Sequence, residues 1–196
     1  MKALITIISL LVITGFSLAF DKNPVVLLKT NLGEIYIQLF SDKAPKTVKQ
    51  FIRYVKDGFY NGIIFHRVIP DFVIQAGGFD KNFNYKKPKY PPIENEADNG
   101  LKNKKGTVAM ARTSDPHSAN AQFFINLKDN YFLDFRNKTP EGWGYTVFGK
   151  VIKGMDVVNK IASVPTKTVI TPYGYMRDVP VKPIIIIEAK VVSNDK

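Results

Sequence analysis

Residues 65–78 read Phe-His-Arg-Val-Ile-Pro-Asp-Phe-Val-Ile-Gln-Ala-Gly-Gly, and the rest of the chain is best interpreted from this stretch outward. Two short apolar runs meet at a Pro-Asp pair, which is typical of a turn between strands. With a strand's period of two, Phe65 and Arg67 share one face, and Val73 and Gln75 share another. A guanidinium and an amide therefore stand among apolar neighbours, where an unpartnered polar group is destabilising by roughly 1 to 3 kcal/mol. Either the fold or a ligand must satisfy them.

Length and composition indicate one compact domain. The chain has 196 residues, of which 45% are hydrophobic and 12% aromatic, which suits a single core rather than a disordered or fibrous chain. It has no cysteine, which excludes disulfides, thiol catalysis and thiolate metal sites. The net charge is +11, but the lysines are scattered and do not interleave with aromatic residues. We interpret them as solvated loop charge and expect no nucleic-acid partner.

The N-terminal residues differ from everything that follows them. A basic start precedes the apolar run Ala3–Phe16, and small residues lead up to Ala19. This pattern predicts a secretory signal peptide over residues 1–19 and a mature domain over residues 20–196. The alternative is an uncleaved anchor, because Ala3–Phe20 is mostly apolar and about as long as the shortest segments that cross a bilayer. We expect an exported protein, periplasmic or else secreted, that meets a membrane only if the signal peptide stays attached.

The pattern of apolar runs predicts eight strands and two helices. An amphipathic helix is expected over about Ala44–Asp57, and a second, short helix is expected with Asp156 as its cap. Phe79–Lys105 and Ser163–Pro183 are expected to be loops. No βαβ alternation occurs, which favours an antiparallel barrel or sandwich. The expected strands are Val25–Lys29, Glu34–Phe40, Ile63–Val68, the apolar run after Pro70-Asp71, Gly106–Ala111, Gln122–Leu127, Tyr145–Val151 and Ile184–Val192.

Four motifs follow one another along the chain: residues 65–78, Met110–Arg112, Gln122–Ile125 and Val147–Val151. In this order they resemble the cyclophilin family of peptidyl-prolyl isomerases, and the resemblance covers essentially the whole chain from Val25 onward. The stretch Pro91–Leu101 is further similar to the exported bacterial branch of that family. The resemblance implies a mainly β fold, a closed eight-stranded antiparallel barrel capped by two helices, with the substrate groove on its outer surface.

The resemblance also implies an activity and a site. The activity is cis/trans isomerisation of X-Pro bonds in proline-containing polypeptides, here exported proteins that are unfolded or still folding, without a covalent intermediate or a cofactor. Arg67 matches the catalytic donor, whose planar fork of N–H groups suits the prolyl nitrogen or the adjacent carbonyl, and Gln75 matches the amide that steadies it. The matching substrate-binding positions are Phe72, Val73, Ala111, Arg112, Gln122, Phe124, Phe132, Leu133 and Tyr145.

Four of these positions depart from the family pattern. Phe132 stands where the members most sensitive to cyclosporin carry tryptophan, so weak inhibition by that drug is expected. Val73 replaces a common methionine by a shorter, stiffer side chain, which loosens the cup for the proline ring. Arg112 replaces an asparagine whose contact is largely through the backbone. Tyr145 replaces a histidine and keeps a ring with a polar tip.

Other chemistry finds little support in the sequence. His66 and His117 are the only histidines and are far apart, so no metal site is expected, and His66 is interpreted as a satisfied structural residue. Glu94 and Glu96 are interpreted as loop charge rather than an acid–base pair. The alternative function is a non-catalytic chaperone or proline-segment binding module that uses the same groove. No heptad pattern or partner helix occurs, so a monomer is expected.

Overall fold

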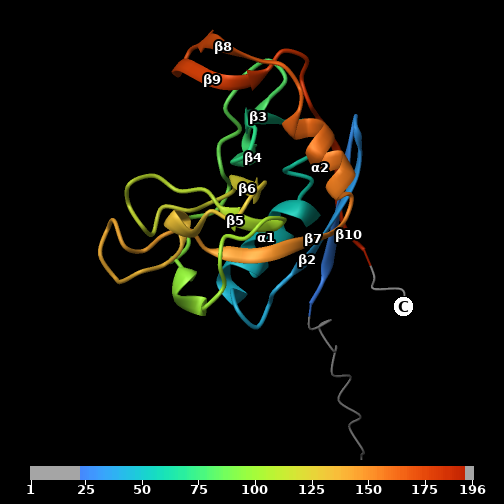
Figure 1. Ribbon diagram of the computed structural model, residues 1–196. Coiled ribbons are helices and arrows are strands. Elements are labelled where there is room, and N and C mark those ends of the chain that lie inside the picture. The colour runs from blue at the N-terminus through green and yellow to red at the C-terminus, as the bar shows by residue number, and fades with distance from the viewer. Residues whose placement is uncertain (1–22, 193–196) are drawn as a thin grey trace, which may run out of the picture.

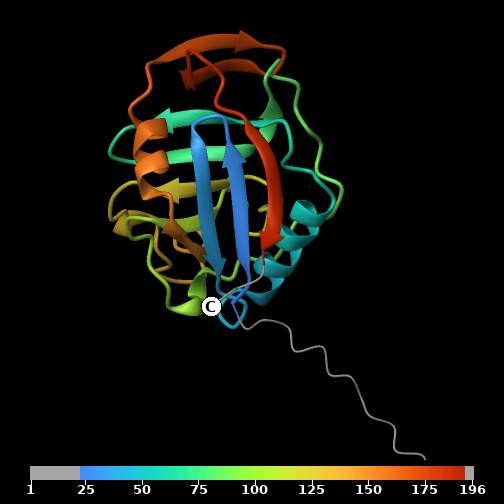
Figure 2. The same ribbon diagram turned by 90° about the vertical axis from the view of Figure 1, so that its right-hand side faces the viewer.

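A computed structural model describes residues 23–192, which form one strongly curled β-sheet with a helix packed on each of two sides. Figure 1 shows the described residues in colour. Figure 2 shows the helices α1 (Pro45–Lys56) and α2 (Met155–Ala162) on opposite sides of the hairpin formed by β1 (Val25–Thr30) and β2 (Gly33–Leu39). The expected signal peptide at residues 1–19 lies outside the described residues. Within residues 23–192, no helix has the length and apolar character needed to cross a membrane.

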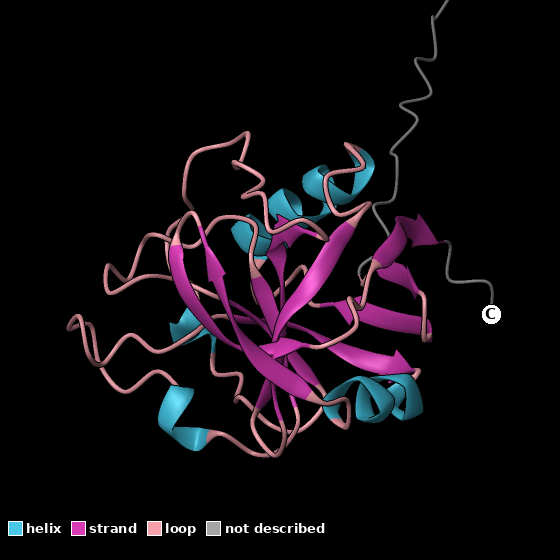
Figure 3. Cartoon of the chain, turned by 90° about the horizontal axis from the view of Figure 1, so that it is seen from above, coloured by secondary structure: helices cyan, strands magenta, loops and turns pink. Residues whose placement is uncertain are grey.

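The eight strands expected from the sequence are confirmed, and all of them belong to the curled sheet. Their order across it is β10-β1-β2-β7-β5-β6-β4-β3, and every neighbouring pair is antiparallel. Viewed from above, the strands cross the middle of the molecule and the helices lie at its rim (Figure 3). The strands are β1 Val25–Thr30, β2 Gly33–Leu39, β3 Ile63–Ile69, β4 Val73–Asp80, β5 Thr107–Met110, β6 Phe123–Asn126, β7 Val147–Lys153 and β10 Ile186–Val192.

The sheet curls into a barrel whose seam is thin. Its two edge strands, β3 and β10, meet near the bridge between Ile64 and Ile185 rather than along a full ladder. Two backbone hydrogen bonds support the seam, from Phe65 N to Ile184 O at 2.9 Å and from Gly62 N to Ile186 O at 2.8 Å. A mainly β, eight-stranded antiparallel fold with two helices is therefore confirmed, but "closed" overstates a sheet that is better described as a half-barrel.

The interior is filled by aromatic side chains from the sheet and from α1 (Pro45–Lys56). The ring of Phe51 lies 5.1 Å from Tyr60, 5.5 Å from Phe123 and 5.0 Å from Phe148, measured between centroids. All four side chains are fully buried. Tilted and edge-on pairs of this kind add to the stabilisation from burial, so this cluster anchors the sheet to the helix.

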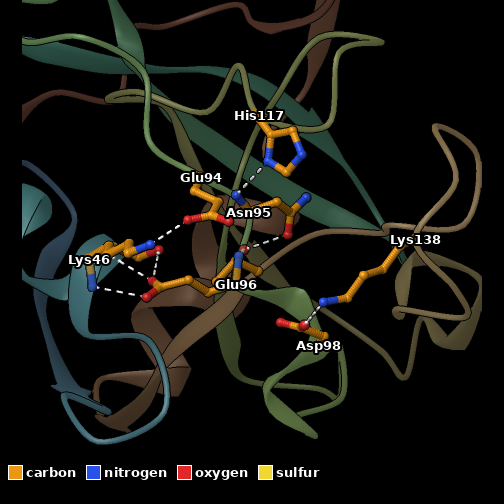
Figure 4. Close-up of polar contacts among 9 residues, drawn as sticks. Lys46, Glu94, Asn95, Glu96, Asp98, His117 and Lys138 are labelled. Carbon is orange, nitrogen blue, oxygen red and sulfur yellow. Dashed lines mark hydrogen bonds and ion pairs between the residues drawn. The ribbon is translucent and has the colours of Figure 1, made fainter.

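A glutamate from a distant loop completes the N-terminus of α1 (Figure 4). The residue before the helix, Ala44, has no side chain that can cap it, and Pro45 takes the first helical position, where no N–H is needed. Glu96 accepts hydrogen bonds from Lys46 N at 3.0 Å and Thr47 N at 2.9 Å. Glu94 pairs with the Lys46 ammonium. Glu94 and Glu96 therefore bind the helix end, and this use agrees with their not forming an acid–base pair.

The start of α2 (Met155–Ala162) corrects one expectation from the sequence. Asp156 is not the cap of the helix but lies inside its first turn, where it pairs with Lys160 at 3.6 Å. The residue before the helix is Gly154, with φ of +93°. A Cβ there would lie 2.1 Å from Glu34 O, so only glycine allows the helix to pack this closely on β2.

The expected loop Ser163–Pro183 contains a second sheet that the sequence did not predict. Strands β8 (Thr166–Thr171) and β9 (Gly174–Pro180) pair antiparallel to form a hairpin, which lies above β3 in Figure 1. The residues of β8 alternate poorly between polar and apolar, and several prolines flank the strands, so the pattern resembled a loop. In the other expected loop, Phe79–Lys105, the first two residues end β4, and the rest has no helix or strand except the 3₁₀ turn η1 (Ala97–Asn99).

Candidate active site

Arg67 reaches the outer face of the sheet because β3 contains a bulge. Phe65 pairs with Ala76 and Arg67 pairs with Gln75, so a step of two residues on β3 faces a step of one on β4. Phe65 is fully buried in the barrel core, whereas Arg67 is half-buried and stands beside Gln75. The expectation that Phe65 and Arg67 share a face is therefore wrong, because a bulge shifts the strand's alternation by one residue.

The register of the sheet then aligns the site across four strands. Arg67 on β3 lies opposite Gln75 on β4, Gln75 opposite Phe124 on β6, and Phe124 opposite Ala109 on β5. Residues that are directly opposite on neighbouring strands point to the same face. Val73, two residues before Gln75, shares that face as the sequence predicted. The register thus brings the polar pair Arg67 and Gln75 together with the apolar side chains of Val73 and Phe124 on the outside of the barrel.

Arg67 begins a short chain of amide contacts. Its Nη1 donates to Gln75 Oε1 over a long 3.5 Å, and Gln75 Nε2 donates to Gln122 Oε1 at 2.9 Å. No carboxylate within residues 23–192 forms an ion pair with Arg67. A guanidinium has five N–H donors, and the contact to Gln75 uses one. The other donors of Arg67 have no hydrogen-bond partner among the described residues and can bind a ligand.

The two glycines that end the 65–78 stretch make room for Gln122. A Cβ on Gly78 would lie 2.8 Å from Gln122 Nε2. A Cβ on Gly77 would lie 2.5 Å from Ala121 O, and Gly77 has φ of +100°, which other residues rarely adopt. Gly77 is therefore needed for the close approach of the segment that carries Gln122, whereas a Cβ at Gly78 would displace the Gln122 side chain.

A cavity of about 140 Å³ opens beside Arg67. Its size suits a small ring rather than a drug-sized ligand. Apolar and aromatic side chains form one part of its wall, and Arg67, Gln75 and Arg112 supply a polar part of similar extent. The cavity is lined by Arg67, Phe72, Val73, Gln75, Ala111, Arg112, Phe124, Leu133 and Tyr145, all of which the sequence singled out as site residues.

The two remaining expected residues lie at its margins. Phe132 does not line the cavity; it is 67% exposed and stacks on Phe72 with ring centroids 5.7 Å apart and planes 20° apart. Gln122 lines an adjoining cavity of about 180 Å³, which shares Gln75, Ala111 and Arg112 with the first. The adjoining cavity also has walls that sequence reasoning missed: Tyr85, Pro88, Thr113, Ser118, Asn120 and Ala121.

Arg112 is held by the backbone and by an aromatic ring. Its Nε donates to Gly144 O at 2.8 Å, and its guanidinium carbon lies 4.8 Å from the centre of the Tyr145 ring. Tyr145 in turn meets Phe124 edge-on at 5.7 Å. This use of its donors distinguishes Arg112 from Arg67, although both are arginines at the same cavity.

Buried asparagines fix the loops that carry two of the cavity walls. Asn130 Nδ2 donates to Phe72 O at 3.1 Å and to Asn126 Oδ1 at 2.9 Å. Asn103 Nδ2 donates to Leu133 O at 3.1 Å. The three asparagines are completely buried. Sequence reasoning missed them, although an asparagine that ends the apolar run Phe-Phe-Ile-Asn was a signal, since a buried amide needs partners.

His66 is buried next to Arg67 and is neutral at ordinary pH. It is 5% exposed, and its ring meets Phe79 edge-on at 5.1 Å. Burial first, and the charge of Arg67 second, lower the pKa of His66 to about 4. Its burial agrees with a structural role, but "satisfied" was wrong for Nδ1, which has no hydrogen-bond partner among the described residues. Within residues 23–192, no group of three acidic or histidine side chains could hold a metal ion.

The chain is similar to known proteins over almost its whole length. The family model for the cyclophilin type peptidyl-prolyl cis-trans isomerase matches residues 25–191. The peptidyl-prolyl cis-trans isomerase of Acinetobacter baylyi is 52% identical over 98% of this chain and 97% of its own length. The peptidyl-prolyl cis-trans isomerase B of Escherichia coli is 56% identical over 84% of this chain and 96% of its own.

Solved structures are similar as well. A cyclophilin type peptidyl-prolyl cis-trans isomerase of Cryptosporidium parvum superposes with a TM-score of 0.70 at 26% identity, covering 88% of this chain and 99% of the other. The same protein in the presence of the dipeptide Ala-Pro gives a TM-score of 0.69 at 27% identity, covering 87% and 99%.

Proposed function

We propose a mechanism from one premise: the chain belongs to the cyclophilin-type peptidyl-prolyl cis-trans isomerase family and is a peptidyl-prolyl cis-trans isomerase. The bond it rotates has a barrier of about 20 kcal/mol, because the prolyl nitrogen shares its lone pair with the carbonyl. Raising the rate from about 0.01 to about 1000 per second requires lowering that barrier by roughly 7 kcal/mol. No covalent bond to the enzyme needs to form.

Arg67 supplies the electrostatic part of this stabilisation. When the amide twists, the lone pair returns to the prolyl nitrogen, which then becomes a hydrogen-bond acceptor. A guanidinium that is always charged, carries no carboxylate partner among the described residues and borders the cavity can donate to that nitrogen or to the adjacent carbonyl. The absence of an ion pair at Arg67 is the observation that carries the mechanism, because a paired arginine would have to break that pair first.

The cavity supplies the positioning part. Phe72, Val73, Phe124 and Leu133 hold the proline ring, while the chain before the proline turns about the bond. Gln75, held by Gln122 at 2.9 Å, keeps the guanidinium in place. Binding that favours the twisted form over both planar forms lowers the barrier, whereas equal binding of all three would not. The Ala111 and Arg112 segment, Gln122, Phe132 and Tyr145 border the flanking peptide.

The clients we propose are proline-containing polypeptides that are exported while unfolded or still folding. The support is the signal-like composition of residues 1–19 together with the isomerase domain that follows. On this proposal the mature enzyme acts in the periplasm as a monomer without a cofactor. Mass spectrometry of the protein purified from the periplasmic fraction checks cleavage after Ala19, and retention in the membrane fraction would favour an uncleaved anchor instead.

The test is an isomerase assay on an X-Pro tetrapeptide with wild type and Arg67→Ala. We expect kcat/KM to fall by about 10²- to 10³-fold in the variant, because one preorganised charged donor is lost. Arg67→Lys is the matched control, since it keeps the charge without the planar fork, and it should recover only a small part of the activity. Thermal melts should agree between the three proteins, as Arg67 forms no ion pair with the described residues.

Two outcomes would count against the proposal. Full activity in Arg67→Ala would exclude the arginine as the donor. Binding of proline peptides by wild type without acceleration would instead favour a non-catalytic chaperone or binding module that uses the same groove.

A further inference from the structure

The β8–β9 hairpin exposes a patch of apolar and aromatic side chains for which the isomerase reaction has no use. Ile170 is 78% exposed and Tyr175 is 76% exposed, and the two are paired across the strands. Tyr173 in the turn is 61% exposed, and Val181 just after β9 is 46% exposed. Large apolar side chains grouped on one exposed element mark a binding surface more often than chance exposure does.

This patch is joined to the isomerase groove through one side chain. Tyr85 lines the adjoining cavity, and its ring centroid lies 6.0 Å from that of Tyr173. Phe79 completes a cluster, 5.6 Å from Tyr85 and 5.9 Å from Tyr173. From Arg67 a continuous surface therefore leads past Gln75 and Tyr85 to the hairpin.

The same region is basic. Residues 79–90 contain four lysines and one acidic residue, and residues 163–183 contain two lysines, one arginine and one acidic residue. Lys86 is tied to Phe59 O at 2.5 Å and Lys89 pairs with Asp57 at 3.7 Å. The other basic side chains are exposed and form no ion pair within residues 23–192: Lys81, Lys87, Lys167, Arg177 and Lys182.

We propose that the β8–β9 hairpin is a second binding surface for the same client polypeptide whose X-Pro bond lies in the groove. The flank of the client that leaves the groove past Tyr85 lies on Ile170, Tyr173 and Tyr175 in an extended form. Aromatic or aliphatic side chains of the client bind these rings, and acidic residues pair with the lysines and Arg177. The surface rests on the proposed function, because it needs the proline in the groove to fix where the flank begins.

Two linked binding surfaces act together by effective concentration. Once the proline is bound, a flank of several residues is confined near the hairpin, so even a weak contact there raises the overall affinity. A tetrapeptide is too short to use this surface. The enzyme then binds long unfolded chains more tightly than short peptides, although Arg67 acts on the X-Pro bond of both in the same way.

The experiment compares an X-Pro tetrapeptide with 20-residue peptides that have the same X-Pro core, extended before or after the proline with Phe and Asp residues. Wild type should bind one of the two long peptides about tenfold more tightly than the tetrapeptide. The double variant Ile170→Ser/Tyr175→Ser should lose this advantage and keep kcat/KM for the tetrapeptide within twofold. Ile152→Ser is the matched control, because Ile152 is 53% exposed on β7, outside the residues that line either cavity, and should change neither value.

A second pair of measurements tests the charge. Lys167→Glu/Arg177→Glu should weaken binding of the acidic long peptide about fivefold, and raising NaCl to about 0.5 M should have a similar effect on wild type, since exposed charges are screened. The tetrapeptide should respond to neither. Binding of a long peptide with lysines in place of aspartates should be weaker than that of the acidic one.

Several outcomes overturn the proposal. Equal affinity of wild type for the tetrapeptide and both long peptides removes the second surface, as does an undiminished advantage in the double variant. Equal losses for short and long peptides would make the hairpin a structural support only. Dimerisation in sedimentation that Ile170→Ser/Tyr175→Ser abolishes would assign the patch to a second copy of the chain. Failure of the isomerase function itself is distinguishable, because it appears as no acceleration of the tetrapeptide by wild type.

Discussion

Phe123 and Phe124 are neighbours on β6, and they belong to opposite faces of the same sheet. Phe123 is fully buried in the barrel, where its ring meets Phe51 at 5.5 Å and Tyr60 at 5.6 Å, both nearly perpendicular. Phe124 is only 5% exposed, yet it lines the cavity beside Arg67. Burial alone therefore does not distinguish the core of this protein from its site.

The inner and outer faces of the sheet differ in how completely their apolar side chains pack. Inside the barrel the aromatic rings fill the space between the sheet and α1. Outside, a small apolar cluster of Val73, Ala109, Phe124, Leu133 and Val147 leaves a cavity and places it next to an arginine that has no ion pair with any described residue. Close packing serves stability, and an apolar surface left incompletely packed beside a charge serves binding.

The largest expected difference between the faces is in stability. Phe123→Ala should lower the free energy of unfolding by about 3 to 5 kcal/mol, because it leaves a cavity in a densely packed cluster. Phe124→Ala should cost less than half as much, since one side of that ring already faces open space, and should raise KM for an X-Pro peptide about tenfold. Urea unfolding and isomerase assays of both variants measure this. Equal losses of stability in the two variants would show that the faces do not differ as described.

His66 and Arg67 are a second pair of sequence neighbours that differ, because His66 is buried and neutral whereas Arg67 is half-buried and borders the cavity. The buried histidine should make the stability of the protein fall in acid. The pKa of His66 falls from its ordinary value of 6.5 to about 4 on folding, so between these pH values the unfolded chain binds the additional proton. The contribution of His66 to the free energy of unfolding is fully present above pH 6.5. It is lost as the pH falls toward 4, and the total loss is about 3 kcal/mol. His66→Phe should therefore lose less stability than wild type between pH 7 and pH 4.

Chemical denaturation of both proteins at the two pH values gives the difference. Carboxylates titrate over the same range, but they do so in both proteins and cancel in the comparison. Identical pH dependence of wild type and His66→Phe would mean that the histidine is not held neutral by burial.

The smallest expected effect concerns a residue that links the two faces. Asn130 is completely buried but holds Phe72 O, and Phe72 forms part of the cavity wall. Asn130→Ala should cost about 1 to 2 kcal/mol of stability, because two hydrogen bonds are lost. It should also raise KM about threefold with little change in kcat, since the wall moves and the donor does not. Asn82→Ala, at an exposed loop asparagine, is the control, and a fall in kcat alone would contradict this role.

The sequence predicted most of the fold because turn residues mark where most strands begin and end. Turn residues separate the eight apolar runs, and the stripe of α1 has the helical period, so element positions follow from local preferences. The β8–β9 hairpin was missed since several of its apolar residues, such as Ile170 and Tyr175, face solvent, where no core imposes a period. The cap of α2 was misassigned because Asp156 is a good capping residue by type, whereas close packing of Gly154 on Glu34 decided where the helix begins.

The candidate site likewise has residues that the sequence predicted and residues that it did not. Residue types in ordered motifs were enough to single out the nine side chains that line the cavity. The missed walls of the adjoining cavity, Asn103 and Asn130 lie in loops whose contacts span tens of residues, and no local pattern encodes such contacts. Only Asn126, at the end of β6, left a signal in the sequence. The bulge in β3 also had no signal in the sequence, although it decides that Arg67 faces outward with Gln75 rather than inward with Phe65.

The sequence by itself determined the eight strands of the curled sheet, the family and the chemistry available: one arginine, one amide and an apolar set in a recognisable order. Only the tertiary structure decided which face each side chain occupies, that Arg67 is left without an ion pair among the described residues, and that an exposed hairpin adjoins the groove. The physical reason is that strand formation depends on near neighbours in the chain. Register, bulges and free donors depend instead on which distant segments pack together.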